Sequence, residues 1–318
     1  MARTLSNNEV VFHHGPLQKG DWEGEGIEIL SVFVDSKVGA KEFEKLPDLK
    51  LIACQSTGYD HIDPKLAREK GVIVSNVPAY GEHTVAEFAF ALLLTLSRKM
   101  IEANKRVAED GYFNPDGLDG FDLFGKTIGI LGTGRIGKNA IKIAKGFGMN
   151  VLAFDAYPDQ NFAKEFGFSY KPIEEILQSA DIISLHLPGN KDTERIINKE
   201  RVSQMKKGMV IINTARGSLI DTESLIWGLE QKIISAAGLD VLSEETYIDD
   251  EFQLLSNPEA KEENMKTLLM NHYLIDHPRV IITPHTAFNT KESTQRIIDT
   301  SIENIEKFAA GSPQNIVS

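Results

Sequence analysis

The residues best suited to acid–base chemistry follow three apolar runs in the second half of the chain. Arg216 comes after the first run and His285 comes after the third. Between them, the adjacent acids Glu244 and Glu245 follow the second run. An arginine fork holds a carboxylate by two hydrogen bonds, a histidine exchanges protons near neutral pH, and a carboxylate beside that histidine favours imidazolium. Reduction of a 2-keto acid needs such a set, with the hydride supplied by a nicotinamide.

A glycine-rich turn indicates where a dinucleotide would bind. The turn lies between a short apolar run and helix-like sequence. Gly132 permits the tight turn, Gly134 lets the backbone approach a pyrophosphate, and Gly137 lets helix and strand pack closely. The free N–H groups at the start of the helix favour an anion. We therefore assign the whole turn to cofactor binding: Gly132, Thr133, Gly134, Arg135, Ile136 and Gly137.

An acid at the end of the next apolar run indicates which dinucleotide binds. Asp155 lies close to the spacing of about 20 residues that the glycine fingerprint requires. A carboxylate there accepts hydrogen bonds from both ribose hydroxyls and repels a 2′-phosphate, and residues 156–158 contain no Arg or Lys. The sequence therefore predicts NAD rather than NADP. The alternative is a solvated acid at a strand end.

Composition narrows the class of protein. A chain of 318 residues with 42% hydrophobic content is long enough for two globular domains. The net charge of −12 argues against a nucleic-acid partner, which would need basic patches. The single cysteine, Cys54, is expected to be a buried strand thiol in a reducing compartment. With neither a signal peptide nor a membrane-spanning run expected, we predict a cytoplasmic protein without membrane contact.

Apolar runs alternate with helix-like segments from residue 127 onward. This alternation predicts an α/β fold with a doubly wound, Rossmann-type parallel sheet covered on both faces. Six strands are expected, at 128–131, 151–154, 182–187, 210–213, 236–241 and 280–283. Helices are expected between them, for example at 138–147, 173–178 and 222–230. Ligands bind outside the carboxyl ends of such strands, so the arginine, the acid and the histidine should converge there.

The N-terminal part predicts a second, smaller α/β domain of flavodoxin-like type, with a cleft between the two domains. Its strands are expected at 27–34, 49–54 and 72–75, with a helix at 64–70. A helix at 293–310 should return to this domain, and a long helix at 83–108 should supply either core packing or a subunit contact. We therefore predict a discontinuous substrate domain, residues 1–95 and 292–318, and an NAD-binding domain, residues 96–291. The polar stretch 245–279 has a possible helix only near 262–273, and so long an excursion in a compact domain is more often functional than idle.

Four motifs carry a family resemblance. They are the glycine turn, Asn213-Thr-Ala-Arg-Gly217, Gly238-Leu-Asp-Val241 and Pro284-His285. In their order and spacing they resemble the D-isomer-specific 2-hydroxyacid dehydrogenases, over nearly the whole chain. The resemblance implies that Arg216 binds the substrate carboxylate and that His285 is the acid/base. It also selects Glu245, the fifth residue after Asp240, as the partner of His285, and it implies no metal.

The same resemblance implies further contacts. Backbone N–H groups at Thr57 and Gly58 should cradle the substrate carboxylate, and Tyr80 should line the substrate pocket. The cofactor should also be contacted by His186, Pro188, Thr214, Ala215, Asp240 and His285. A homodimer is a further expectation. The chain departs from the family's pattern at 10–16, where the first strand and helix look abbreviated.

Within the family the chain is most similar to the D-lactate dehydrogenase branch. The segment Pro78-Ala-Tyr80 and the long excursion after Glu245 carry this similarity. We therefore expect reversible reduction of a short 2-keto acid, pyruvate first, to the D-2-hydroxy acid by NADH. Glyoxylate, hydroxypyruvate or a branched-chain keto acid are alternative substrates. A different class of function is an NAD-sensing regulator, because the C-terminal-binding corepressors are similar in fold.

Overall fold

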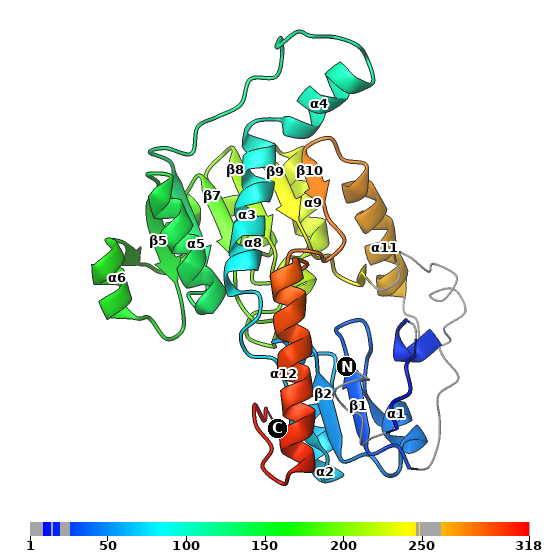
Figure 1. The fold of residues 1–318 in the computed structure, drawn as a ribbon. Helices are drawn as coiled ribbons and strands as arrows, with labels where there is room; N and C mark the ends of the chain where they lie inside the picture. Colours follow the sequence, from blue (N-terminus) through cyan, green and yellow to red (C-terminus); the bar gives the residue numbers. More distant parts are fainter. Residues whose placement is uncertain (1–8, 14, 20–25, 246–247, 249–261, 318) are drawn as a thin grey trace. The chain divides into compact units, whose positions relative to one another are not determined.

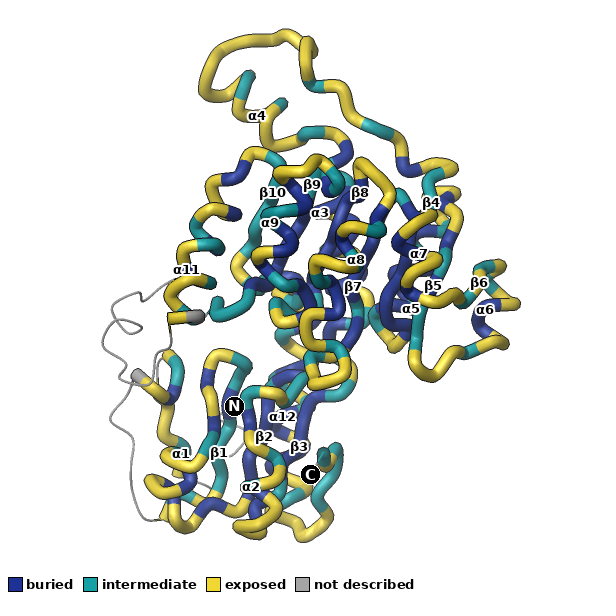
Figure 2. The backbone as a smooth tube through the Cα atoms, turned by 180° about the vertical axis from the view of Figure 1, so that it is seen from behind, coloured by how far each residue is buried: buried dark blue, intermediate teal, exposed yellow. Residues whose placement is uncertain are grey.

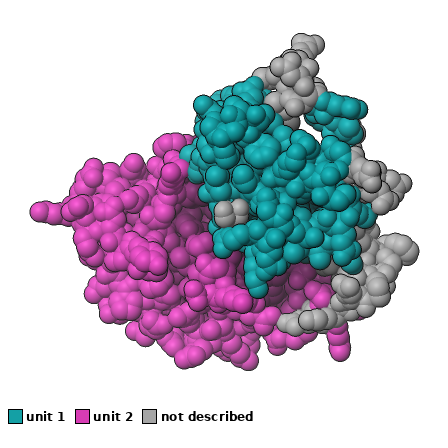
Figure 3. All heavy atoms as spheres, turned by 90° about the horizontal axis from the view of Figure 1, so that it is seen from below, with its two compact units in different colours: residues 1–81, 289–318 teal, residues 82–288 magenta. Residues whose placement is uncertain are grey.

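The chain divides into two compact units. The computed structural model describes residues 9–13, 15–19, 26–245, 248 and 262–317, with only the backbone of residue 263. Unit 1 comprises Met1–Gly81 and Asn289–Ser318, and unit 2 comprises Glu82–Phe288 (Figure 3). The sequence-based boundaries, at 95/96 and 291/292, differ mainly in assigning the helix that starts at Glu82 to the first domain. The assignment of a substrate domain and a cofactor domain to these units stays a prediction.

Unit 2 is built on a seven-stranded, entirely parallel sheet (Figure 1). Its spatial order is β10-β9-β8-β7-β4-β5-β6. The chain runs outward from β4 to β6, returns to β7 on the other side of β4, and continues to β10, so the strand order reverses between β4 and β7. Such a reversal is where open α/β sheets bind ligands. The strands are β4 Thr127–Leu131, β5 Asn150–Phe154, β6 Ser169–Tyr170, β7 Ile182–Leu185, β8 Met209–Asn213, β9 Ile234–Leu239 and β10 Val280–Ile282.

Helices cover both faces of this sheet, because successive strand side chains point to opposite faces. Ile182 packs in the cluster that contains side chains of α3 and α5, whereas Ile183 packs in the cluster of α7, α8 and α9. The central strands are accordingly buried along their length (Figure 2). The helices of unit 2 are α3 Glu82–Ser97, α4 Met100–Ala108, α5 Arg135–Gly146, α6 Gln160–Phe166, α7 Ile173–Ser179, α8 Lys199–Gln204, α9 Thr222–Glu230 and α11 Glu262–Ile275, with a 3-10 turn at Gly217–Leu219. The predicted doubly wound α/β class is confirmed.

The single long helix predicted at 83–108 is wrong in one respect, since the structure has two helices there. Lys99 adopts a left-handed backbone conformation, with φ of 50°, between α3 and α4. The carbonyl of Ser97 accepts a hydrogen bond from the backbone N–H of Phe121 at 2.9 Å, so it is engaged outside the helix. No side chain of α4 is buried. The break therefore depends on a contact with a segment more than twenty residues away, which helical periodicity does not reveal.

Unit 1 is a three-stranded parallel sheet in the order β1-β2-β3. The long C-terminal helix α12 covers one face, where Ile302 and Ile305 pack on Leu51 and Ala53 of β2. The chain end also returns here, because Val317 N donates to Val74 O at 2.9 Å. The elements are η1 Leu17–Lys19, β1 Ile29–Val32, α1 Ala40–Lys45, β2 Leu51–Cys54, α2 Pro64–Glu69, β3 Ile73–Ser75 and α12 Lys291–Ala309. In the described part of the chain, no helix has the length and apolarity needed to cross a bilayer.

Candidate active site

The glycine turn after β4 leaves no room for side chains at two of its three glycines. A Cβ on Gly137 would lie 2.0 Å from the carbonyl oxygen of Gly132, and one on Gly132 would lie 2.5 Å from the carbonyl oxygen of His186. Gly132 also has a φ of +98°, which side chains rarely adopt. Gly134 is different, because a Cβ there would meet nothing within 4 Å. Its open side suits the close approach of a ligand.

The helix that follows this turn can receive an anion. Gly134 is the N-cap of the 12-residue helix α5, and no side chain caps it. The first N–H groups of the helix therefore have no side-chain acceptor at that position, and the helix dipole adds partial positive charge. Asp155 directly follows β5, and its Oδ2 accepts hydrogen bonds from Thr133 N at 2.6 Å and Thr133 Oγ1 at 2.9 Å. These residues fit the pyrophosphate and ribose of a dinucleotide.

The loop after β7 brings His186 against the glycine turn. Burial lowers the pKa of His186 to about 4, so its ring is neutral near pH 7. Its Nε2 lies 2.9 Å from Ser184 Oγ. Pro188 follows, exposed, and its carbonyl accepts a hydrogen bond from Thr193 Oγ1 at 2.5 Å. His186 therefore packs here as an uncharged group, and its predicted contact with the cofactor stays a prediction.

Asn213 shapes the loop after β8 that carries Arg216. Its side-chain amide donates to Arg216 O at 2.9 Å and its side-chain oxygen accepts from Ala215 N at 3.0 Å. Arg216 Nη1 in turn donates to Ala215 O at 2.7 Å. Thr214 Oγ1 is buried and has no hydrogen-bond partner among the described residues. Asn213 belongs to the sequence motif without a predicted role, and the structure shows that it holds the arginine loop.

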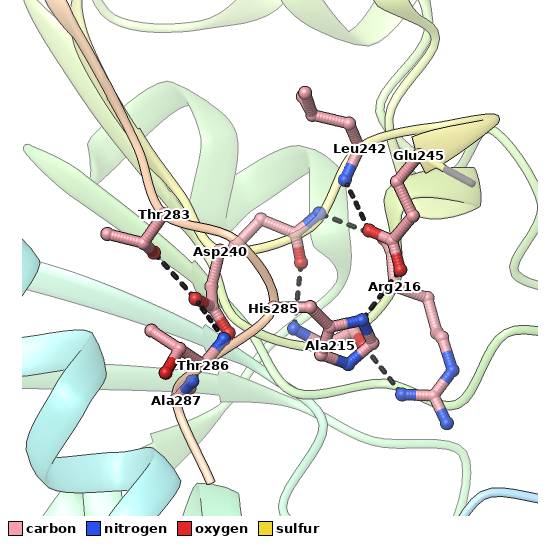
Figure 4. A network of polar contacts seen from close by, with 10 residues as sticks. Ala215, Arg216, Asp240, Leu242, Glu245, Thr283, His285, Thr286 and Ala287 are labelled. Atoms are coloured by element: carbon pink, nitrogen blue, oxygen red, sulfur yellow. Dashed lines mark hydrogen bonds and ion pairs between the residues drawn. The ribbon is translucent and has the colours of Figure 1, made fainter. Parts of the chain in front are cut away.

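Gly217 lets the arginine loop approach the loop after β9. A Cβ on Gly217 would lie 2.1 Å from the carbonyl carbon of Leu242 and 2.4 Å from Ser243 N. Backbone atoms cannot give way to such a contact, so only glycine fits. The two loops that carry Arg216 and Glu245 are therefore in direct contact, as Figure 4 shows from close by.

Glu245 and His285 form a close pair. Nδ1 of His285 lies 2.6 Å from Oε1 of Glu245, while Oε2 of the same carboxylate accepts from Leu242 N at 3.0 Å (Figure 4). The second bond fixes the carboxylate, and the carboxylate fixes the imidazole. Because Glu245 engages Nδ1, Nε2 is the nitrogen that can exchange a proton with a substrate. Both side chains are partly exposed, so a small molecule can reach them.

A buried acid, Asp240, holds the backbone that carries His285. Its carboxylate, in a residue only 1% exposed, accepts from Thr283 Oγ1 at 2.5 Å, Thr286 N at 2.9 Å and Ala287 N at 2.8 Å. Burial raises the pKa of Asp240, and these three hydrogen bonds oppose the rise. His285 itself has a left-handed φ of 48°. The surroundings of Asp240 thus keep His285 in an uncommon backbone conformation.

A residue of α11 also contributes, although no sequence pattern points to it. Asn271 is fully buried and its side-chain amide donates to Ser243 O at 2.7 Å. Ser243 lies in the turn just before Glu245. An ion pair connects α11 to α9, with Lys266 Nζ 2.6 Å from Glu223 Oε2. The helix expected near 262–273 is present, whereas the predictions for 246–247 and 249–261 lie outside the described residues.

The substrate-binding residues predicted in the first domain lie in unit 1. Thr57 Oγ1 donates to Val77 O at 2.7 Å, and the Asn76 side chain donates to Thr57 O at 2.8 Å. The loop of Thr57 and Gly58 is thereby tied to the segment that leads to Tyr80. Arg296 of α12 donates to Tyr80 O at 2.9 and 2.6 Å. The roles of Thr57, Gly58 and Tyr80 in binding substrate stay predictions.

A dinucleotide cradle and an arginine–glutamate–histidine set at the ends of one doubly wound sheet define a nicotinamide-dependent oxidoreductase. Residues 90–287 match the family model described as "D-isomer specific 2-hydroxyacid dehydrogenase, NAD binding domain". The chain therefore belongs to the D-isomer-specific 2-hydroxyacid dehydrogenases, as the four motifs predicted, and its cofactor is NAD. Among the described residues, no group of three His, Cys, Asp or Glu side chains is arranged to hold a metal ion.

Similar proteins support the same assignment over nearly the whole chain. A 2-hydroxyacid dehydrogenase homolog of Schizosaccharomyces pombe is 38% identical over 307 residues, covering 95% of this chain and 90% of its own. A glyoxylate reductase of Korarchaeum cryptofilum is 35% identical over 294 residues, covering 91% and 82%. A solved D-lactate dehydrogenase of Aquifex aeolicus, complexed with NAD and lactic acid, has a TM-score of 0.87 at 33% identity, covering 98% and 92%.

Proposed function

We propose that the protein reduces pyruvate to D-lactate with NADH, in a reversible reaction. The observation that carries the proposal is the Glu245–His285 pair, 2.6 Å apart, together with the contact between the loop of Glu245 and the loop of Arg216. The Aquifex D-lactate dehydrogenase, solved with lactic acid, supports a short substrate. The segment Pro78-Ala-Tyr80 and the long stretch after Glu245 support the same branch.

In the proposed mechanism Arg216 binds the substrate carboxylate with its planar fork, which orients the neighbouring carbonyl. NADH, when bound, supplies the hydride. Imidazolium His285 donates a proton from Nε2 to the carbonyl oxygen as negative charge develops there. Glu245 accepts the hydrogen bond from Nδ1 and stabilises the positive ring before the transfer. Thr57, Gly58 and Tyr80 are included as further substrate contacts on the basis of the family resemblance.

The nearest alternative is another 2-hydroxy acid. The similar glyoxylate reductase supports this alternative, as the same catalytic set serves several keto acids. Substrates that differ by one methylene are discriminated by only about 1–3 kcal/mol, so pocket side chains decide between them. An NAD-sensing regulator is disfavoured by the complete arginine–glutamate–histidine set.

The test is the loss of NADH absorbance with a panel of pyruvate, hydroxypyruvate, glyoxylate, phenylpyruvate and 2-ketoisocaproate. We expect the highest kcat/KM with pyruvate. A higher kcat/KM with another keto acid would contradict the assignment of lactate as product, but it would remain consistent with the proposed mechanism. No turnover on any of them, together with tight NADH binding and NADH-dependent assembly, would favour the regulator.

We also propose a homodimer and a cytoplasmic location. Large apolar side chains are exposed on α4 and the segment after it, and exposed apolar groups of this kind mark protein contacts. They are Met100, Ile101, Val107, Tyr112 and Phe113. Light scattering coupled to size exclusion should give twice the chain mass, and a Phe113→Asp variant should shift this value toward a single chain. The lone, free and buried Cys54 supports the cytoplasmic location.

A further inference from the structure

A chain of hydrogen bonds runs from the edge strand β6 to the acid at the end of β5. Asp159 N lies 3.2 Å from the hydroxyl oxygen of Tyr170. That hydroxyl lies 2.9 Å from Thr133 Oγ1, which lies 2.9 Å from Oδ2 of Asp155. Four residues from three separate segments of unit 2 are thus connected in one line. Tyr170 was not among the residues that the sequence singled out.

The direction of this chain is fixed by its two ends. A backbone N–H can only donate and an ionised carboxylate can only accept. The single hydroxyl hydrogen of Thr133 must therefore go to Asp155, so the Tyr170 hydroxyl must donate to Thr133 while it accepts from Asp159 N. Hydrogen bonds aligned in one direction strengthen one another. The hydroxyl of Tyr170 is the link on which the alignment depends.

The chain acts on the orientation of the Asp155 carboxylate. Oδ2 accepts both the N–H and the hydroxyl of Thr133, while Oδ1 accepts, from the described residues, only the N–H of Tyr157 at 2.9 Å. Each carboxylate oxygen has two lone pairs, so Oδ1 retains acceptor capacity for ribose hydroxyls. A carboxylate held in this way cannot rotate its charge away from a group bound beside it.

Lys138, a cation on α5, forms an ion pair with Asp159, which also takes part in the chain of hydrogen bonds. Lys138 Nζ lies 2.6 Å from Oδ2 of Asp159 and 4.9 Å from the ring centre of Phe162. The hydrogen bond from Lys138 lowers the pKa of Asp159, so this carboxylate is ionised near neutral pH. The ammonium group is thereby engaged one turn into the helix that starts at the glycine loop, instead of being free to attract a 2′-phosphate.

We propose that Tyr170 is a positioning residue that sets the preference for NADH over NADPH, by fixing Asp155 through Thr133. A fixed Asp155 accepts the 2′-hydroxyl of NADH and repels the 2′-phosphate of NADPH. Loss of the tyrosine hydroxyl removes the donor to Thr133 Oγ1, which weakens one of the three hydrogen bonds that hold the carboxylate. Asp155 then accepts the 2′-hydroxyl less well and repels the 2′-phosphate less strongly. The inference deepens the cofactor assignment and does not depend on which keto acid is reduced.

The test is the Tyr170→Phe variant, with NADH and NADPH titrated directly by fluorescence in the absence of any keto acid. The phenylalanine retains the ring contact with Phe168, whose centre lies 5.2 Å away, so the fold is kept. We expect the Kd for NADH to rise about 3- to 10-fold, as for the loss of one aligned hydrogen bond. The Kd for NADPH should stay unchanged or fall, so the ratio of the two constants decreases.

A matched control removes a different tyrosine hydroxyl from the same unit. Tyr273→Phe deletes the hydrogen bond to Glu230 Oε1 at 2.7 Å, and it should alter neither Kd. Thr133→Val should reproduce the effect of Tyr170→Phe, and the double variant should add little, because both act on one chain. Unchanged constants in Tyr170→Phe would overturn the proposal, as would equal weakening of both nucleotides, which would show a merely structural role. If the unaltered protein bound neither nucleotide, the cofactor assignment itself would fail.

Discussion

The carboxyl edge of the sheet in unit 2 has two halves that are built in opposite ways. Around β4, β5 and β7 the site is made mainly of backbone, with Gly132 and Gly137 in contact with carbonyl groups at distances that exclude a side chain. Around β8, β9 and β10 it is made of side chains, with Glu245 and His285 2.6 Å apart. The first half suits a large anion held by many N–H groups, and the second suits a small reacting group.

This difference teaches how each half can be damaged. A site made of backbone is disrupted by an added side chain, because the neighbouring carbonyl groups cannot move away from the new atoms. A site made of side chains is broken by removed functional groups, because the rest of the loop stays in place. Histidine illustrates the contrast, since burial keeps His186 neutral in the first half whereas a carboxylate accompanies His285 in the second.

The largest effect is expected from His285→Ala. Loss of the proton donor should lower kcat by about 10²- to 10⁴-fold, which is the usual contribution of a general acid. NADH should still bind, because the glycine turn is unaltered. Steady-state kinetics and NADH titration measure the two effects separately. His83→Ala, on the exposed side of α3, is the control; a His285 variant with near-normal kcat would remove His285 from the mechanism.

The next largest effect is expected in the glycine turn, where two variants distinguish a loss of stability from a loss of NADH binding. Gly137→Ala places a Cβ 2.0 Å from a carbonyl oxygen, and should lower the free energy of unfolding by about 1–3 kcal/mol and abolish tight NADH binding. Gly134→Ala is the matched variant, since its Cβ meets no protein atom within 4 Å. It should leave denaturant stability unchanged and weaken only NADH binding. Equal stability of the two variants would contradict the contrast between these glycines.

A smaller effect is the pH dependence of stability that His186 contributes. The pKa of His186 is lowered from 6.5 to about 4 in the folded protein, so the unfolded chain binds the proton more readily. The stabilisation is present above pH 6.5 and is lost as the pH falls toward 4, by about 2–3 kcal/mol. Urea unfolding across this range should show a steeper loss in the unaltered protein than in His186→Asn. Equal slopes would rule out this contribution.

The smallest effect is expected at Asn271. Asn271→Ala removes the hydrogen bond to Ser243 O and loosens the turn before Glu245, which should lower kcat about 3- to 10-fold without altering the Kd for NADH. Lys266→Ala is the control, because it removes the exposed ion pair between α11 and α9 and leaves Ser243 untouched. If both variants lost activity equally, the helix would act through its packing rather than through Asn271.

The sequence predicted the site where its determinants are local. The glycine turn and Asp155 are signalled by residue types at short spacing, and the expected strands agree with the observed ones within a few residues because apolar runs mark buried parallel strands. The pairing of Glu245 with His285, rather than Glu244, followed from the family motif and is observed.

The remaining features depend on contacts between distant segments. Strand β6 has only two residues, too few for a periodic signal, yet it carries Tyr170. The break at Lys99 depends on Phe121, and the turn before Glu245 depends on Asn271, which lies 28 residues from Ser243. Neither long-range bond has a local pattern, so neither could be predicted without the fold.

The hydrogen bonds to the buried carboxylate of Asp240 allow the opening of the His285 loop to be measured by amide hydrogen exchange. The amide hydrogens of Thr286 and Ala287 are both bound to that carboxylate, so they exchange with solvent only when the loop opens. Their exchange in deuterated water therefore records how often the loop opens, in the absence of any substrate. Slow exchange would mean that His285, the proposed acid/base, is already in place before the keto acid arrives. Little ordering of this loop would then remain for binding to accomplish.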